Sequence, residues 1–501
     1  MNSTTLKTSF VPVTRTLAKV VGKEYVDAVI AARAFLQPHH RVSRDLDSDI
    51  DFFPANHHAH LITLLDRVGD KVTPALPHSA AGVTSDTFAA ATKTGLAPLS
   101  GLGYFRIGES GKLYFTAKCE HYHSPLGHAF PGYALLDDAR ALGIPNATHN
   151  NTRGHITRLL EGRLREAAGG PYHVLNLETG SLAGEAALKM ILNRFYRIQD
   201  DVAPPKYEGK IPVFVVLGDD ACTTKGNYHG TTILTQMMRG MWPELTAAAE
   251  KKDLFLVRAV RPNVLSDFTA LTQEFDSGQY KLAGFFHEIV MMNYAARRLQ
   301  PAFLQSIYTL CAERDIPTVA DEIQSCLWAP DLFLAREYGL SPTFILVGKG
   351  FPGGEFAASR LLFRKDMDTL PQFGALITNG QQEIAALAYL VTMIWAESNA
   401  DITREVGDYY MAQLQVLQTR FPEQIASIDG LRHLAGINFH ELDNAKRFTT
   451  LMSEGGIDIS VQTYKDGCPP CALTKLPLIA GFEVVDWLMR RMDGVLRVLK
   501  H

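Results

Sequence analysis

Lys349 stands between two glycines, just after the apolar run of residues 344–347. A lysine at the end of a buried strand, beside an apolar wall, can lose its proton and act as a nucleophile. A solvated loop lysine is the commoner meaning of such a segment taken alone. The interpretation therefore depends on which other reactive side chains share its surroundings.

Asp321 ends a second apolar run, residues 316–320. A carboxylate so close to a buried strand needs a cation or several hydrogen-bond donors, because an unpaired buried charge is costly. The simpler alternative is an aspartate that caps the next helix. The stretch between Asp321 and Lys349 has the length of a parallel crossover, so we expect both side chains on one edge of a sheet.

The segment Thr179-Gly180-Ser181 follows a third run, residues 174–177, and opens a helical pattern. Free backbone amides at a helix start bind phosphate well, and a glycine there lets the backbone approach closely. A serine in this position is more often a plain helix cap. The segment gains meaning only together with Asp321 and Lys349.

A phosphate-binding segment, an acid and a lysine at one edge of the sheet are what pyridoxal 5'-phosphate requires. Lys349 would form a Schiff base with the cofactor, and Asp321 would keep the pyridine nitrogen protonated. The protonated ring then stores the electrons of a substrate carbanion. The sequence predicts a pyridoxal-phosphate enzyme with Lys349 and Asp321 as its catalytic residues.

The elements that position these residues are six apolar runs, most of them rich in β-branched residues, separated by helical segments or loops. The runs span residues 174–177, 211–217, 254–260, 282–292, 316–320 and 344–347. Such alternation predicts an α/β fold with a mainly parallel sheet covered on both faces. Ligands of such sheets gather at the carboxyl ends of the strands.

Four segments, in their order along the chain, resemble motifs of the class III (ornithine/ω-amino acid type) pyridoxal-phosphate aminotransferases of fold type I. They are Thr179-Gly180-Ser181, Tyr228-His229-Gly230, Asp321-Glu322-Ile323-Gln324 and Gly348-Lys349-Gly350. The resemblance runs from about residue 101 to the C-terminus. The order of the motifs is more specific than any one of them.

The resemblance implies further cofactor contacts. Tyr228 would stack on the cofactor ring, Gln324 would reach the ring hydroxyl oxygen, and Gly180 with Ser181 would hold the phosphate. Glu288 stands where the family has a Val-Glu-Pro segment. Thr378 is similar in placement to a threonine that reaches the phosphate of the neighbouring subunit, which implies a homodimer with shared active sites.

Two departures from the family pattern concern the substrate. The stretch of residues 286–293 lacks the family's glycine loop, and Lys475 stands where many members carry an arginine that holds the substrate carboxylate. Lys475 could take that role, although a point charge matches a carboxylate less well than a planar guanidinium. The amino donor and the carbonyl acceptor therefore stay open.

The predicted organisation has a large cofactor-binding α/β domain over residues 167–382. Residues 101–166 and 383–501 are expected to form a smaller α+β domain, and residues 1–100 an N-terminal extension whose role is open. Long helical patterns cover residues 381–395 and 401–420.

Composition limits the remaining classes of protein. With 46% apolar and 20% charged residues, and 49 basic against 53 acidic side chains, the chain of 501 residues is an ordinary globular protein with no sign of nucleic-acid or membrane-surface binding. Histidines near the start, such as His57 and His58, have no compelling ligand spacing, so no metal is expected.

Six scattered cysteines fit a reducing compartment, and we expect a cytoplasmic protein. The longest uncharged apolar run, residues 384–396, is too short for the roughly 20 residues of a membrane span. A secretory signal is not expected in residues 1–22, whereas a transit peptide stays open.

The predicted function is the transfer of an amino group from an amine or amino acid to a keto acid or aldehyde. Two alternatives stay open. The same lysine and acid also serve a racemase, epimerase or aminomutase, and a non-catalytic cofactor-binding relative could act as a scaffold.

Overall fold

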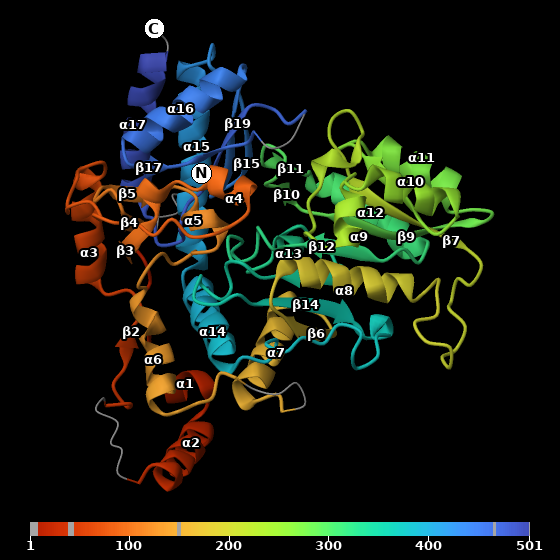
Figure 1. The fold of residues 1–501 in the computed structure, drawn as a ribbon, viewed down its shortest axis with the longest axis horizontal. Helices are drawn as coiled ribbons and strands as arrows, with labels where there is room; N and C mark the ends of the chain where they lie inside the picture. Colours follow the sequence, from red (N-terminus) through yellow and green to blue (C-terminus); the bar gives the residue numbers. More distant parts are fainter. Residues whose placement is uncertain (1–8, 39–44, 148–151, 464–466, 500–501) are drawn as a thin grey trace, which may run out of the picture.

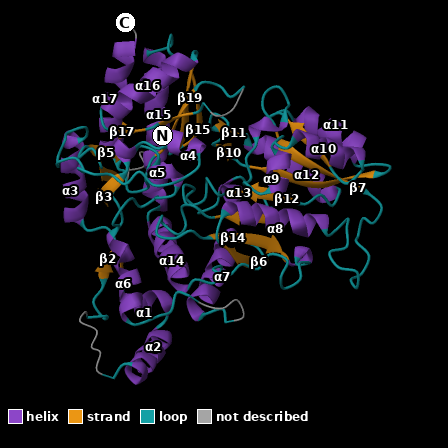
Figure 2. Ribbon diagram, viewed as in Figure 1, coloured by secondary structure: helices purple, strands orange, loops and turns teal. Residues whose placement is uncertain are grey.

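The computed structural model describes residues 9–38, 45–147, 152–463 and 467–499. Its centre is a sheet of seven strands in the order β6-β14-β13-β12-β9-β7-β8 (Figures 1 and 2). The strands are β6 (Tyr172–Leu177), β7 (Ile211–Leu217), β8 (Leu256–Val260), β9 (Tyr280–His287), β12 (Thr318–Asp321), β13 (Phe344–Val347) and β14 (Ser359–Arg364). Only β14 runs antiparallel to its neighbours within this sheet. The predicted mainly parallel α/β sheet is confirmed.

The sheet is covered on both faces because successive residues of a strand point to opposite sides. In β7, Phe214 and Val216 join an apolar cluster with the inner face of α8 (Gly180–Leu192). Val213 and Val215 join the main core on the other face, together with α11 (Leu265–Phe275) and α12 (Pro301–Glu313). The helices on the two faces of the sheet therefore exclude water from its backbone.

The prediction of one continuous strand over the apolar run of residues 282–292 is wrong. Residues 282–292 divide into β9, which ends at His287, and β10 (Val290–Met291), which pairs with β11 (Arg297–Arg298) in a separate hairpin. The chain leaves the sheet at Glu288, whose side chain faces a cavity at the carboxyl edge. The polar residue inside the apolar run marks this break.

Segments from both ends of the chain share one small sheet. Strands β3 (Pro98–Leu102), β4 (Phe105–Gly108) and β5 (Leu113–Thr116) are extended by β17 (Ile457–Asp458), which pairs in parallel with β5. A second small sheet contains β15 (Ile425–Leu431), β16 (Leu434–Phe439), β18 (Ser460–Val461) and β19 (Cys471–Lys475). Helix α15 (Ala400–Arg420) packs on β15, α16 (Leu442–Glu454) packs on β16, β18 and β19, and α17 (Phe482–Leu499) packs on α15 and α16. Helix α14 (Glu383–Ser398) instead contacts α7 (His155–Ala168) and α6 (Ala134–Ala141). The domain boundaries at residues 166 and 382 stay predictions.

The first hundred residues contain more structure than the sequence indicated. They form β1 (Thr14–Arg15), α1 (Leu17–Val21), α2 (Lys23–Leu36), β2 (Ile50–Asp51), α3 (Ala55–Leu64) and α4 (Asp86–Ala91). Leu17, Val21 and Phe52 are buried in the main core, whereas α2 projects from the body and exposes Phe35 (Figure 1). Residues 1–8, at the start of the segment considered for a transit peptide, lie outside the described residues.

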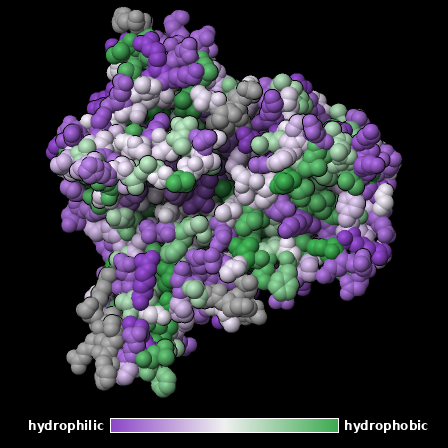
Figure 3. All heavy atoms as spheres, in the orientation of Figure 1, coloured by the Kyte–Doolittle hydropathy of each residue, from purple (hydrophilic) through white to green (hydrophobic). Residues whose placement is uncertain are grey.

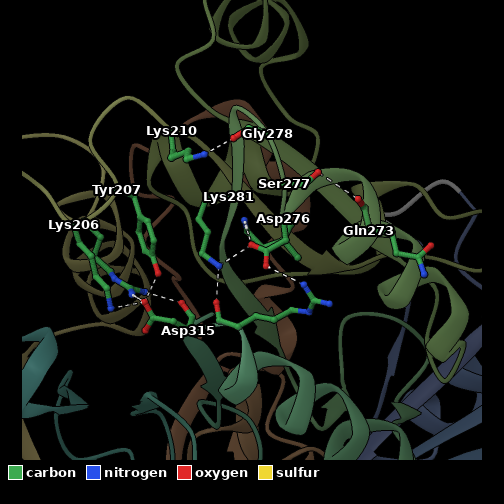
Figure 4. A network of polar contacts seen from close by, with 12 residues as sticks. Lys206, Tyr207, Lys210, Gln273, Asp276, Ser277, Gly278, Lys281 and Asp315 are labelled. Carbon is green, nitrogen blue, oxygen red and sulfur yellow. Dashed lines mark hydrogen bonds and ion pairs between the residues drawn. The ribbon is translucent and has the colours of Figure 1, made fainter.

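A polar network closes the amino edge of the sheet, opposite the predicted site (Figure 4). Lys281 Nζ donates to Asp276 Oδ1 at 2.7 Å and to the Arg314 carbonyl at 2.5 Å. Lys206 and Asp315 form an ion pair of 2.6 Å between neighbouring loops. These carboxylates are neutralised by structural partners, which distinguishes this edge from the carboxyl edge.

Across the described ranges, no helix is long and apolar enough to span a bilayer.

Candidate functional site

A cavity of about 390 Å³ lies at the carboxyl edge of the central sheet. Seven of the eight predicted site residues line it, coming from five separated parts of the chain. They are Gly180, Ser181, Tyr228, Glu288, Asp321, Gln324 and Lys349. As expected for polar residues that follow parallel strands, these side chains meet at the carboxyl edge of the sheet.

The start of α8 forms one wall of the cavity. Thr179 is the cap, with its hydroxyl accepting from the Leu182 amide, so Ser181 is free for another task. Ser181 Oγ accepts from the Thr231 amide at 3.0 Å. Gly230 has φ +141° and a Cβ there would lie 2.8 Å from Ser181 Cα, so only glycine allows these backbones to approach. The result is a close cradle of backbone amides that suits a phosphate group.

Asp321 lies at the end of β12 and is buried. Its Oδ2 is 2.8 Å from His229 Nδ1, and its Oδ1 accepts from the Ile323 amide at 3.1 Å. The alternative that Asp321 caps the next helix is wrong, since α13 (Leu334–Glu337) begins 13 residues further on. A carboxylate that faces a cavity and is oriented by a buried histidine fits the partner of a pyridinium nitrogen.

Lys349 follows β13 and points into the same cavity. Burial lowers the pKa of its amine, while the charges of Glu288 and Asp321 oppose that shift. Its backbone has φ +37°, an unfavourable conformation for a lysine, and such strain is typical of functional sites. This environment differs from that of a solvated loop lysine and favours a nucleophile.

Gln324 supplies a direct test of whether the cavity fits the cofactor. Its Oε1 atom is buried and has no hydrogen-bond partner among the described residues. Buried polar atoms are rarely left unsatisfied, so a bound polar group at this point would complete the site. Together with the amide cradle, the oriented Asp321 and the half-buried Lys349, the residues present fit pyridoxal phosphate.

A loop that the sequence analysis did not identify closes the cavity. His121 and His123 belong to α5 (Cys119–Tyr122) and the residue after it, and both line the cavity. Burial, followed by the charge of Lys349, lowers the pKa of His121 to about 4. Glu120 holds the loop through His128 Nε2 at 2.8 Å. The sequence signal that could have identified this loop is the segment Glu120-His121-Tyr122-His123, which follows the short strand β5.

A second cavity, of about 440 Å³, adjoins the first. The two cavities share His121, Tyr228, Asn293, Gln324 and Lys349. The remaining wall of the second cavity comes from Tyr122, Arg239, Met292, Ser460, Val461, Gln462 and Leu473. It thus extends from Lys349 toward β18 and β19 of the second small sheet.

Lys475 does not take the position expected for a substrate-binding cation. Its side chain is fully buried, with Nζ donating to the Tyr122 carbonyl at 3.1 Å and lying 3.7 Å from the centre of the Trp328 ring. It is absent from the described residues that line either cavity. Burial lowers its pKa to about 7. Lys475 therefore packs beneath the site.

The pKa of Lys475 predicts a pH-dependent contribution to stability. The unfolded chain keeps this proton up to about pH 10.5, whereas the folded protein releases it above about pH 7. Folding then becomes more favourable as the pH rises between these values, by about 1 kcal/mol per pH unit at most. Urea unfolding from pH 7 to 9 should show wild type gaining stability relative to Lys475→Met. A difference that does not change with pH would contradict this, and exposed Lys365→Met serves as the control.

Thr378 is the predicted site residue that the structure does not bring to the cavity. It lies in the loop before α14 and is exposed.

Comparisons with known proteins place the chain in one enzyme family. Residues 101–493 match the family model "Aminotransferase class-III". An ornithine aminotransferase of Bordetella pertussis is 22% identical over 403 residues, which cover 79% of this chain and 90% of that protein. That of Bacillus subtilis is 24% identical over 385 residues, covering 74% and 85%.

Solved structures show the same fold. The ornithine aminotransferase from Toxoplasma gondii superposes with a TM-score of 0.68 at 20% identity, covering 85% of this chain and 97% of that one. A transaminase from the marine bacterium Virgibacillus gives a TM-score of 0.69 at 17% identity, covering 84% and 97%. The chain therefore belongs to the class-III aminotransferase family and is a pyridoxal-phosphate-dependent aminotransferase of fold type I.

Proposed function

We propose that Lys349 holds the cofactor and that the enzyme moves an amino group from an amine or amino acid to a keto acid or aldehyde. The observation that carries this proposal is the convergence on one cavity of Lys349, the Asp321–His229 pair and the start of α8. At the amino edge of the same sheet, by contrast, Lys281 and Lys206 are held in ion pairs with Asp276 and Asp315.

Each residue has a task that its surroundings support. Lys349 would hold the cofactor, and once its amine is free it would carry a proton to and from the substrate carbon as general acid and base. The lowered pKa supplies the neutral amine that this task needs. When bound, pyridoxal phosphate supplies an electron sink for the substrate carbanion. Asp321 holds a proton on the ring nitrogen, and His229 fixes the orientation of Asp321.

The remaining cofactor contacts follow from the cavity walls. Gly180 and Ser181 would bind the phosphate through the amides at the start of α8, and Tyr228 would stack on the ring. Gln324 would use its unpaired oxygen atom toward a polar group of the ring. Glu288 lies close enough to Lys349 to influence the pKa of its amine, and we propose that Glu288 helps to set the protonation state of that amine.

A half-reaction distinguishes aminotransfer from the alternative chemistries. With donor alone, an aminotransferase converts its cofactor to the amine form and releases one carbonyl product per site. A racemase or epimerase inverts the substrate carbon and an aminomutase moves the amino group along it, and neither releases a carbonyl product. A scaffold protein leaves both cofactor and donor unchanged. Product without any change of the bound cofactor would contradict the proposal.

We also propose a homodimer in which each subunit completes the other's site. Thr378 is exposed and away from its own cavity, and Phe373, in the same loop, is 83% exposed. On the neighbouring surface, Figure 3 shows apolar side chains over the region of α9 (Ile233–Met238) and α10 (Pro243–Lys251). The exposed apolar residues of these segments include Ile233 and Trp242, the residue before α10. A second subunit would cover them. Sedimentation velocity decides the matter, and a monomer at micromolar concentration would reject the proposal.

A cytoplasmic location is proposed because the six cysteines form no disulfide in the structure, which suits a reducing compartment. Cell fractionation tests it, and recovery from an oxidising compartment would reject it.

A further inference from the structure

We propose that Arg239 binds a carboxylate of the substrate in the second cavity, so that the enzyme selects amino and keto acids over simple amines. The inference rests on the proposed role of Lys349 as the reacting amine, since the two side chains line the same cavity. It assigns a substrate class that neither the family nor the fold specifies.

The guanidinium of Arg239 is held at the cavity wall. Arg239 follows α9, its side chain is half-buried, and its Cζ lies 4.9 Å from the centre of the Tyr228 ring. A guanidinium stacked on an aromatic face keeps its N–H groups free in the ring plane. Tyr228 lines both cavities, so the stacking fixes Arg239 beside the place predicted for the cofactor ring.

Arg239 also lacks an anionic partner. Among the described residues, no carboxylate lies within ion-pair distance of its guanidinium, and no aspartate or glutamate lines the second cavity. Arginines of the adjoining loops are already neutralised. Arg297 pairs with Asp220 and Asp429, each at 3.1 Å. Arg239 is thus a half-buried cation with no anionic partner among the described residues, and it lines the same cavity as Lys349.

The chemistry of the wall selects one kind of substrate. A guanidinium presents paired donors that match the two oxygens of a carboxylate. Asn293, Gln324 and Gln462 add neutral polar groups, of which Gln462 is fixed by its bonds to Met292 O and Ala295 N. A second ammonium group on the substrate would find no acidic partner on this described wall. The geometry therefore favours a substrate whose carboxylate faces Arg239 while its amine faces Lys349.

Two small reagents test the inference without turnover. Aminooxyacetate and O-methylhydroxylamine both attack, through the aminooxy nitrogen, the carbon that Lys349 would hold as an imine, so that an oxime forms and the Lys349 amine is released. Only the first reagent carries a carboxylate. The readout is the rate at which the visible band of the lysine-bound cofactor disappears. Arg239→Met should slow aminooxyacetate roughly 10- to 100-fold, the range expected for lost charge-assisted hydrogen bonds, and change O-methylhydroxylamine less than about twofold.

Two variants make the result specific. Arg239→Lys should recover part of the preference, because it keeps the charge but not the planar fork. Arg491→Met removes an arginine that similarly stacks on an aromatic ring, Trp487 at 5.7 Å, far along the chain in α17, and should leave both rates unchanged. Equal slowing of both reagents by Arg239→Met, or no slowing of either, would overturn the inference. A wild-type protein with no visible band would instead reject the role of Lys349.

Discussion

Replacing Lys349 with alanine is expected to abolish amino transfer, with kcat falling by at least about 10³-fold. Positioned general acid–base groups contribute roughly 10²–10⁴-fold, and this residue is also the proposed point of cofactor attachment. Lys349 lines both cavities, and no other lysine lines either of them among the described residues. Steady-state kinetics with saturating cofactor give the measurement.

A folding control is essential to this result. Lys349→Ala removes one amine without adding bulk, so the melting temperature should stay close to that of wild type. Lys365→Ala changes an exposed lysine just after β14 and should leave kcat unaffected. Wild-type turnover in Lys349→Ala would reject the proposed mechanism.

Asp321→Asn is expected to lower kcat by about 10²–10³-fold while leaving the fold intact. Asparagine keeps the shape of the side chain and a contact to His229, but it removes the negative charge that stabilises a protonated ring nitrogen. Loss of one preorganised electrostatic partner typically has an effect of this size. The measurement is kcat at saturating substrate and cofactor.

Asp315→Asn provides the matched comparison. Asp315 is an aspartate at the opposite, amino edge of the same sheet, where it pairs with Lys206. Its replacement should lower the melting temperature slightly and leave kcat unchanged. If Asp315→Asn reduced kcat as much as Asp321→Asn, the effect of Asp321 would be structural, and its assignment would be wrong.

The central sheet and most of the site were predictable from the sequence. The bounds of β7 and β13 match apolar runs, because strands buried on both faces must be apolar at every position. The carboxyl-edge rule then brought Asp321 and Lys349 together. Residues 282–292 were misjudged because an apolar run does not reveal where a strand leaves the sheet.

Other features depend on contacts between distant segments. Leu17 and Phe52 are fully buried, but the surrounding sequence has no regular periodicity because these residues pack against α14 and nearby elements instead of forming a long amphipathic helix. The loop at Glu120 has positive φ values that no local rule predicts. Arg239 reaches the second cavity only because Tyr228 and β18 meet there, so its role became visible with the structure.

The central claim is that Lys349 carries pyridoxal phosphate, and the visible absorption spectrum before and after borohydride tests it most directly. Wild type should show a band of the lysine-bound cofactor that borohydride bleaches, with the reduced cofactor then attached to a peptide containing Lys349. Lys349→Ala should lack both the band and the labelled peptide. Wild-type protein without such a band after addition of pyridoxal phosphate, or a label on another lysine, would contradict the account.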